Sequence, residues 1–259
     1  MEKNPQGRIQ SLDRAFSLIE IIANSPDPLT LKKITELADL PKPTVYRILT
    51  SLETWGYVEQ DKYNNYKLGT KFLILGSKVQ DSLEIRKIAR PFLKELNNET
   101  KETIFLGVID KGRSLYVDKL DGHHSVRLVS RIGSRNHLHS TSLGKCLLSG
   151  LTEAEIREII SQQGMPALTA NTITDLDRLM DQIKLVREKG YAMDDMENEE
   201  GVRCVASPVK NHKGKVIAAI SISGPAQRIT DETIDAKLRP ALLSSANKVS
   251  QALGYIDGQ

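Results

Sequence analysis

The chain has few cysteines and no long apolar run. Cys146 and Cys204 are its only cysteines, and they do not form a CxxC pair. This pattern argues against a disulfide framework or a structural zinc site and is typical of a reducing compartment. The first ten residues lack an apolar stretch, and aliphatic or aromatic runs such as Phe72 to Leu75 are too short to span a bilayer. We therefore expect a cytoplasmic protein with no membrane contact.

The motifs of common enzymes are missing as well. The sequence contains no G-x-S-x-G, P-loop, G-x-G-x-x-G or H-E-x-x-H, so no catalytic residue is expected. The alternative is a small-molecule hydrolase that uses a C-terminal thiol or hydroxyl. Turnover of small acids by the purified protein, abolished by Cys204→Ser, would support this alternative. The histidines at 123–124 and 137–139 could bind a metal ion together with the acidic residues of 194–200. Adjacent histidines point apart, however, so we expect neither a metal nor another cofactor.

The composition is that of an ordinary folded protein. The 259 residues are 39% hydrophobic and 27% charged, which is enough for two domains with their own cores. A formal net charge of +3 is too small to indicate nucleic-acid binding by itself. Any such function must be argued from where the charges lie.

Residues 29–68 have the pattern of two short helices, a turn and a two-stranded hairpin. Thr30 can cap the first helix, and a turn follows at residues 39–41. Pro43 suits the first turn of a second helix, which Gly56 can end in a left-handed conformation. The second helix is expected to bury Val45, Ile48, Leu49 and Leu52.

The outward face of this second helix can approach DNA. No acid lies between Asp39 and Glu53, so nothing on that face repels phosphates. From Lys62 to Gln80 there are four lysines and no carboxylate, which suits a wing lying along the sugar-phosphate backbone. A solvated hairpin would explain the wing alone, but helix, turn, helix and wing in this order favour DNA binding. The residues expected to contact DNA are Lys42, Pro43, Thr44, Tyr46, Arg47, Thr50 and Lys62.

Helices are expected on both sides of this unit. Ser11 should cap an upstream helix whose buried face includes Leu12 and Phe16. Downstream, a helix that starts after Gly69 should be broken or restarted at Pro91. This downstream helix is expected to bury Phe72, Leu73, Leu75, Gly76 and Val79.

The remainder of the chain combines strands and helices as in an α+β sensor domain. Alternating apolar residues predict strands at 103–110, 115–120, 125–131, 202–210 and 215–223. Helical spacing predicts helices at 142–149, 153–162, 175–189 and 230–253. The predicted division is a DNA-binding domain at 1–77, a helical linker at 78–100 and an effector-binding domain at 101–259.

Small polar side chains suggest a cavity in the third part. The helix that begins at Ser142 leaves backbone N–H groups free to hold an anion such as a carboxylate. Period-two alternation places Ser221 and Ser223 on one face of a strand, and Cys204 lies in the same relation on the strand before it. Asp194 could accept a hydrogen bond from a ligand hydroxyl. A capped helix and a wet sheet face would explain the same pattern.

Four separated motifs occur in a specific order. They are LPKPTVYRILTSLETWGYVE followed by YKLG, LHSTSLGKCLL, GYAMDDMENEEGVRCVASPV and AAISISGP. In this order they resemble the IclR family of bacterial transcriptional regulators. The sequence departs from the family pattern at His137, where proline is common, and at Lys210, where an aromatic residue or histidine is usual.

The resemblance implies a fold and a ligand site. The fold is α+β, with an N-terminal winged helix-turn-helix domain, a helical linker and a C-terminal GAF-like antiparallel-sheet effector domain. A small organic acid would lie among the pocket residues of the family, while Lys145 could neutralise that acid or extend into water. The implied effector-binding residues are Ser142, Leu143, Asp194, Cys204, Ser221 and Ser223, with Leu128 and Val202 as apolar walls.

The leading hypothesis is therefore a DNA-binding transcriptional regulator whose operator affinity responds to a small carboxylate effector. Two recognition helices of a homodimer would bind a palindromic operator. The sequence leaves open activator or repressor, dimer or tetramer, and the identity of the effector, for which we favour a short keto or hydroxy acid. A scaffold that dimerises through the linker helix and merely retains a pocket is a further alternative.

Overall fold

The structure is a computed structural model that describes residues 9–82, 84–125 and 128–256. The side chains of residues 77 and 79–82 are outside this description. The chain divides into two units, residues 1–82 and 83–259.

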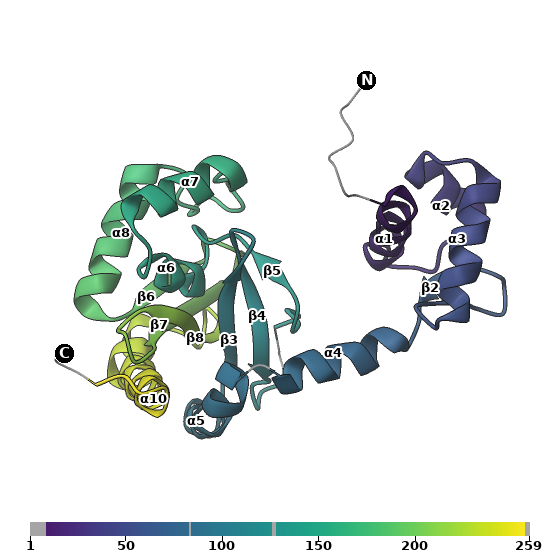
Figure 1. Cartoon of the computed structure of the whole chain (residues 1–259). Coiled ribbons are helices and arrows are strands. Elements are labelled where there is room, and N and C mark those ends of the chain that lie inside the picture. Colours follow the sequence, from purple (N-terminus) through teal and green to yellow (C-terminus); the bar gives the residue numbers. More distant parts are fainter. Residues whose placement is uncertain (1–8, 83, 126–127, 257–259) are drawn as a thin grey trace. The chain divides into compact units, whose positions relative to one another are not determined.

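The first unit has the order of elements expected of a winged helix-turn-helix (Figure 1). The Thr30 hydroxyl accepts a hydrogen bond from the backbone N–H of Lys33 at 3.2 Å, so it caps its helix as predicted. Gly56 follows the next helix with φ +74°, which confirms its predicted left-handed conformation. The elements are α1 (Gln10–Ala23), α2 (Leu31–Ala38), α3 (Lys42–Thr54), β1 (Val58–Gln60), β2 (Tyr66–Leu68) and α4 (Lys71–Ser82).

Two expectations for α1 were wrong. The N-cap is Ile9, which makes no side-chain cap hydrogen bond, and Ser11 lies inside the helix. Phe16 is 62% exposed, whereas Leu18 and Ile22 are buried against α2 and α3. Because α1 has apolar residues on several sides, its spacing did not reveal which side packs on the other helices.

Helix α4 does not bury the apolar residues expected of it. Leu73 is 76% exposed, and Leu75 and Gly76 are exposed as well. Phe72 is half-buried and packs edge-on against Tyr57 at 5.3 Å between ring centroids. The predicted burial of Val79 lies outside the described side chains.

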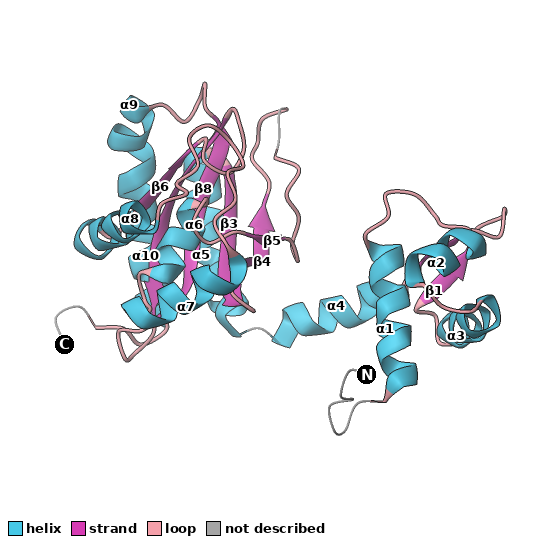
Figure 2. Cartoon of the chain, turned by 90° about the horizontal axis from the view of Figure 1, so that it is seen from above, coloured by secondary structure: helices cyan, strands magenta, loops and turns pink. Residues whose placement is uncertain are grey.

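The second unit contains a six-stranded antiparallel sheet of order β5-β4-β3-β8-β7-β6, shown in magenta in Figure 2. Its strands are β3 (Thr103–Asp110), β4 (Arg113–Leu120), β5 (Arg135–Asn136), β6 (Ala192–Asp195), β7 (Val202–Lys210) and β8 (Val216–Pro225). Its helices are α5 (Glu84–Thr100), α6 (Ser142–Leu148), α7 (Glu153–Gln163), α8 (Leu176–Lys189), α9 (Asp231–Thr233), the π-helical turn η1 (Ile234–Leu238) and α10 (Arg239–Ala252).

The sheet is covered on both faces. Ile220 and Ile222 of β8 pack with residues of α5 and α10 on one face, whereas Ala219 packs with α6, α7 and α8 on the other. The α+β class is therefore confirmed. Ser221 and Ser223 alternate with these isoleucines and are buried on the face that carries α6.

Four details of the second unit differ from the prediction. Residues 128–131 do not form a strand, while residues 126–127 lie outside the described residues. The edge strand is instead β5, and β6 was not predicted. Pro91 lies inside α5, because Leu93 and Leu96 pack in the core and offset the missing backbone hydrogen bond. Residues 230–253 form α9, η1 and α10 rather than one helix.

Candidate functional site

The outward face of α3 is open to solvent. Lys42, Pro43, Tyr46, Arg47 and Thr50 are exposed on it. The hydroxyl of Thr50 donates to the backbone oxygen of Tyr46 at 2.9 Å, so only its lone pairs and methyl group face outward. Among the described residues, the Arg47 guanidinium has no carboxylate partner. The structure thus gathers these five predicted DNA-contacting residues on one exposed helix face.

Thr44 and Lys62 lie beside this face. Thr44 is half-buried on the flank of α3 that faces α1. Lys62 is exposed at the tip of the wing, where its ammonium lies 4.9 Å from the centroid of the Tyr63 ring. The Asp61 carboxylate accepts backbone hydrogen bonds from Tyr63 and Asn65 at 2.8 and 2.9 Å, which fixes the tip. Tyr63, whose ring is exposed at this tip, was not predicted from the sequence as a DNA-contacting residue.

A small cavity in the second unit is lined by all eight residues that were predicted to surround an effector. Asp194, Cys204 and Ser223 are direct neighbours across β6, β7 and β8 and form a row on one face of the sheet. The N-terminus of α6 borders the same cavity. The Thr141 hydroxyl caps the backbone N–H of Gly144 at 3.0 Å, so this cap does not occupy the N–H groups of Ser142 and Leu143. The eight lining residues are Leu128, Ser142, Leu143, Asp194, Val202, Cys204, Ser221 and Ser223.

Further residues that line the cavity were not predicted from the sequence. Phe105 and Tyr116 stack with ring centroids 4.3 Å apart and form an aromatic wall. The cavity measures about 30 Å³, which is room for about two water molecules. A metabolite with several heavy atoms therefore requires the walls to move outward. Other lining residues are Ser130, Thr141, Asn198 and Glu199.

One wall of the cavity is held by Lys119. Its ammonium donates to the backbone oxygen of Leu128 at 3.0 Å and pairs with Asp121 at 2.8 Å. The same ammonium lies 5.7 Å from the centroid of the Phe105 ring. Leu128 lines the cavity but does not belong to a strand. Its contact with Lys119 is therefore a candidate place at which the cavity wall could open.

The charge inside the cavity is acidic. Its lining includes Asp194 and Glu199 and no lysine, arginine or histidine. Burial, followed by the nearby Glu197 carboxylate, raises the pKa of Asp194 to about 7, although the backbone N–H of Glu197 donates to it at 2.8 Å. Burial also raises the pKa of the Cys204 thiol well above its ordinary value, and the Asp194 charge adds to this effect. The thiol stays protonated and is a poor nucleophile.

Asp194→Asn should change how stability depends on pH. In the unfolded chain this carboxyl ionises near pH 4, whereas the folded carboxyl keeps its proton to about pH 7. The folded state thus binds more protons in this window, and the free energy of unfolding of the wild-type second unit falls as pH rises, by at most about 4 kcal/mol. Amide hydrogen exchange in β7 at about pH 4.5 and about pH 7.5 measures the difference between the two proteins. An identical pH response would contradict the raised pKa.

A buried ion pair lies next to the cavity. Lys145 of α6 is 1% exposed, and its ammonium donates to the Glu197 carboxylate at 2.5 Å and to the backbone oxygen of Met193 at 2.9 Å. Lys145 therefore neither extends into water nor lines the cavity. Its ion pair with Glu197 instead holds α6 against the segment that follows β6.

The remaining polar residues singled out in the sequence have structural contacts. His123 lies 3.1 Å from the Asn97 side chain, and His139 lies 3.2 Å from the backbone oxygen of Pro166. The Lys210 ammonium lies 5.0 Å from the centroid of the Tyr255 ring. In the described part of the chain, no group of three or more histidine, cysteine or acidic residues could hold a metal ion. No helix among the described residues combines the length and apolar character needed to cross a bilayer.

A winged helix-turn-helix unit joined to an α+β unit with a polar cavity defines the class as a DNA-binding transcriptional regulator. Profiles of known domains agree. The IclR helix-turn-helix domain matches residues 11–62, and the bacterial transcriptional regulator IclR C-terminal domain matches residues 77–251. The chain belongs to the IclR family.

Relatives and solved structures match along nearly the whole chain. The HTH-type transcriptional regulator XynR of Escherichia coli (strain K12) is 37% identical over 248 residues, covering 95% of this chain and 98% of that protein. The HTH-type transcriptional regulator KdgR of the same strain is 34% identical over 258 residues, covering 99% and 97%. The crystal structure of the Thermotoga maritima IclR has a TM-score of 0.79 at 33% identity, covering 96% of this chain and 100% of that one. XynR and KdgR are transcriptional regulators, and the family to which the chain belongs is one of transcriptional regulators rather than enzymes, which agrees with the expectation of no catalytic residue and disfavours the hydrolase alternative.

Proposed function

We propose that the chain regulates transcription by binding an operator through α3 and the wing, with an affinity set by a small organic acid in the second unit. The cavity that gathers all eight expected effector residues is the observation that carries this proposal. The carboxylate would accept hydrogen bonds from the backbone at the start of α6, and a hydroxyl would donate to Asp194. The acidic lining disfavours a second carboxylate on the ligand, so a short keto or hydroxy monoacid fits best.

Regulation requires that the acid prefers one arrangement of the protein. The cavity of about 30 Å³ is too small for such an acid without movement. Binding would displace Leu128 from its contact with Lys119 and so favour a different state of the second unit. A coupling free energy of about 1–3 kcal/mol would change operator affinity about 5- to 150-fold.

The regulator would act in the cytoplasm as a homodimer, or as a tetramer built from dimers. Two α3 helices spaced about 34 Å apart enter successive major grooves of a palindromic operator. Leu73 on α4 and Phe16 on α1 are exposed apolar side chains that an association of two chains could cover.

Lys62→Ala should weaken binding to every duplex by a similar factor. Its ammonium would contact phosphate rather than a base, so its loss removes one counterion-releasing contact and makes the slope of log affinity against log salt shallower by about 0.9. Fluorescence-anisotropy titrations of two unrelated duplexes over a salt series measure both effects. A loss confined to one operator base pair would assign Lys62 to base recognition instead.

The proposal as a whole is tested by genome-wide mapping of binding sites followed by a metabolite screen. Purified protein should prefer the strongest mapped site over a scrambled duplex of the same composition. A monoacid that raises thermal stability by binding the folded state should also change affinity for that site. Ser223→Leu, which fills the cavity, should abolish the response while leaving DNA binding intact. A protein with no preference among duplexes, with or without the acids, would refute the function.

A further inference from the structure

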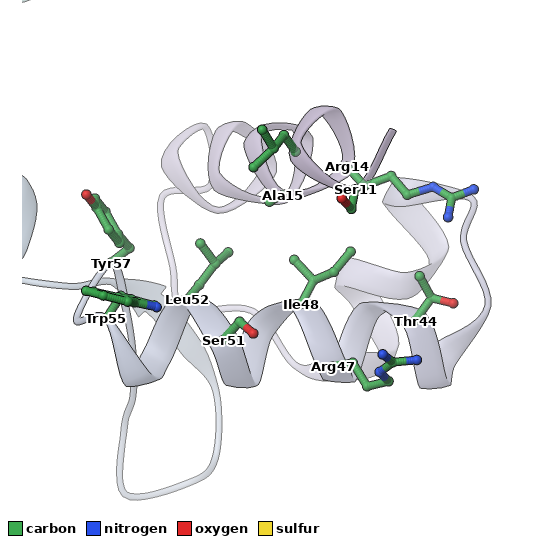
Figure 3. Close-up of a pocket in the computed structure, with 11 residues that line it drawn as sticks. Ser11, Arg14, Ala15, Thr44, Arg47, Ile48, Ser51, Leu52, Trp55 and Tyr57 are labelled. Atoms are coloured by element: carbon green, nitrogen blue, oxygen red, sulfur yellow. The ribbon is translucent and has the colours of Figure 1, made fainter. Parts of the chain in front are cut away.

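A groove of about 550 Å³ lies between α1 and α3 in the first unit, beside the exposed face of α3. Figure 3 shows Ile48 and Leu52 pointing from α3 toward α1. Trp55, which is 70% exposed, lies with Tyr57 at one end of the groove. The other end is polar and is formed by Ser11, Arg14, Thr44 and Arg47.

The side chains at the polar end have no hydrogen-bond or ion-pair partner in the part of the chain that the structure describes. Within the described residues, neither Arg14 nor Arg47 forms an ion pair, and the hydroxyls of Ser11 and Thr44 make no hydrogen bond. The nearest acid on α1, Asp13, does not line the groove. The guanidinium group of Arg14 and the hydroxyls of Ser11 and Thr44, unpaired among the described residues, thus lie at one end of the groove, and Arg47 lies on the adjoining outward face of α3.

This set of donors suits a phosphate group. Guanidinium groups bind phosphate oxygens in a forked geometry, and hydroxyls can donate to the remaining oxygens. The groove adjoins the face of α3 that carries Arg47, so DNA bound to that face brings its backbone to the polar end. Thr44 is half-buried on this flank, which suits a backbone contact better than base recognition.

We propose that Arg14, with Ser11 and Thr44, binds a backbone phosphate of the operator, so that α1 contacts DNA in addition to α3 and the wing. This inference rests on the proposed DNA-binding role of α3. A phosphate contact fixes the position of the reading helix on the duplex and carries no sequence information. Arg14 would therefore contribute to affinity and salt dependence, while Arg47 contributes to selectivity.

The test compares Arg14→Ala with Lys184→Ala in the full chain. Lys184 is exposed on α8 of the second unit, so its loss makes the same change in net charge away from the groove. Affinity is measured from low to high salt for the duplex that the wild type selects from a random pool and for a scrambled duplex. We expect Arg14→Ala to weaken binding to both duplexes and to make the slope of log affinity against log salt shallower by about 0.9. Lys184→Ala should leave both affinities and the slope unchanged. Arg14→Lys should keep the slope.

Three outcomes would overturn the inference. The first is a salt slope for Arg14→Ala equal to that for Lys184→Ala. The second is a loss of sequence preference at a single base pair in Arg14→Ala. The third is an Arg14→Ala variant that does not fold, together with a Thr44→Val variant that binds DNA like the wild type. Amide hydrogen exchange in α1 and α3 reports whether the first unit of each variant is folded. If the wild type selects no duplex, the proposed function itself fails. If it does select one and Arg14→Ala behaves as the wild type, only this inference fails.

Discussion

Lys145→Met should lower the free energy of unfolding of the second unit by about 3–5 kcal/mol. The substitution keeps an unbranched apolar chain in the core but removes the ammonium that pairs with Glu197 at 2.5 Å. The other carboxylate oxygen of Glu197 is buried without a hydrogen-bond partner in the described part of the chain. Removing Lys145 would therefore leave a buried charge with little compensation, and that cost exceeds what the added apolar surface contributes.

The cost can be assigned by a double substitution. Lys145→Met with Glu197→Gln should be less destabilised than Lys145→Met alone, because no buried charge then remains. Lys184→Met on the exposed side of α8 is the matched control and should change stability by less than about 0.5 kcal/mol. Amide hydrogen exchange in β7 and β8 reads the second unit directly. A double variant as unstable as the sum of its singles would show that the pair does not act together.

Arg47→Ala should cost about 1–3 kcal/mol of operator binding and relax the sequence preference at one position of each half-site. The guanidinium is exposed on the outward face of α3 and pairs with no carboxylate among the described residues. It is therefore free to donate two parallel hydrogen bonds to a guanine edge in the major groove. Selection from a random duplex pool, followed by competition titrations, measures both effects.

Arg47→Lys separates charge from geometry at the same position. Lysine retains the positive charge but lacks the planar fork, so the variant should keep non-specific affinity and lose most of the discrimination. Equal affinity and selectivity for wild type and Arg47→Ala would show that Arg47 does not contact a base.

Most of the correct predictions of the fold depend on local properties of the sequence. Thr30 and Gly56 were placed correctly as a helix cap and a left-handed terminator because each property depends on the residue itself and its nearest backbone. Strand β7 was predicted with its observed bounds because alternation along a strand has a fixed period of two. The same period placed Ser221 and Ser223 on the face opposite the isoleucines of β8.

Expectations failed where packing at a distance decides between local alternatives. Pro91 reads as a helix break, yet α5 continues through it because its apolar face is held by the sheet and α10. The apolar residues of α1 admit more than one buried face, and only contact with α2 and α3 selects Leu18 over Phe16. The groove beside Arg14 could not be predicted, since its two walls come from separate helices.

The sequence by itself determined the order of elements in the first unit, the family and eight of the residues that line the cavity, because spacing, caps and alternation are local and the family motifs are long. The tertiary structure decided the small size of the cavity, the burial of Lys145 against Glu197 and the meeting of Arg14 with Thr44. Each of these depends on side chains far apart in the chain, and their separation and solvent exposure are set only when the elements pack together.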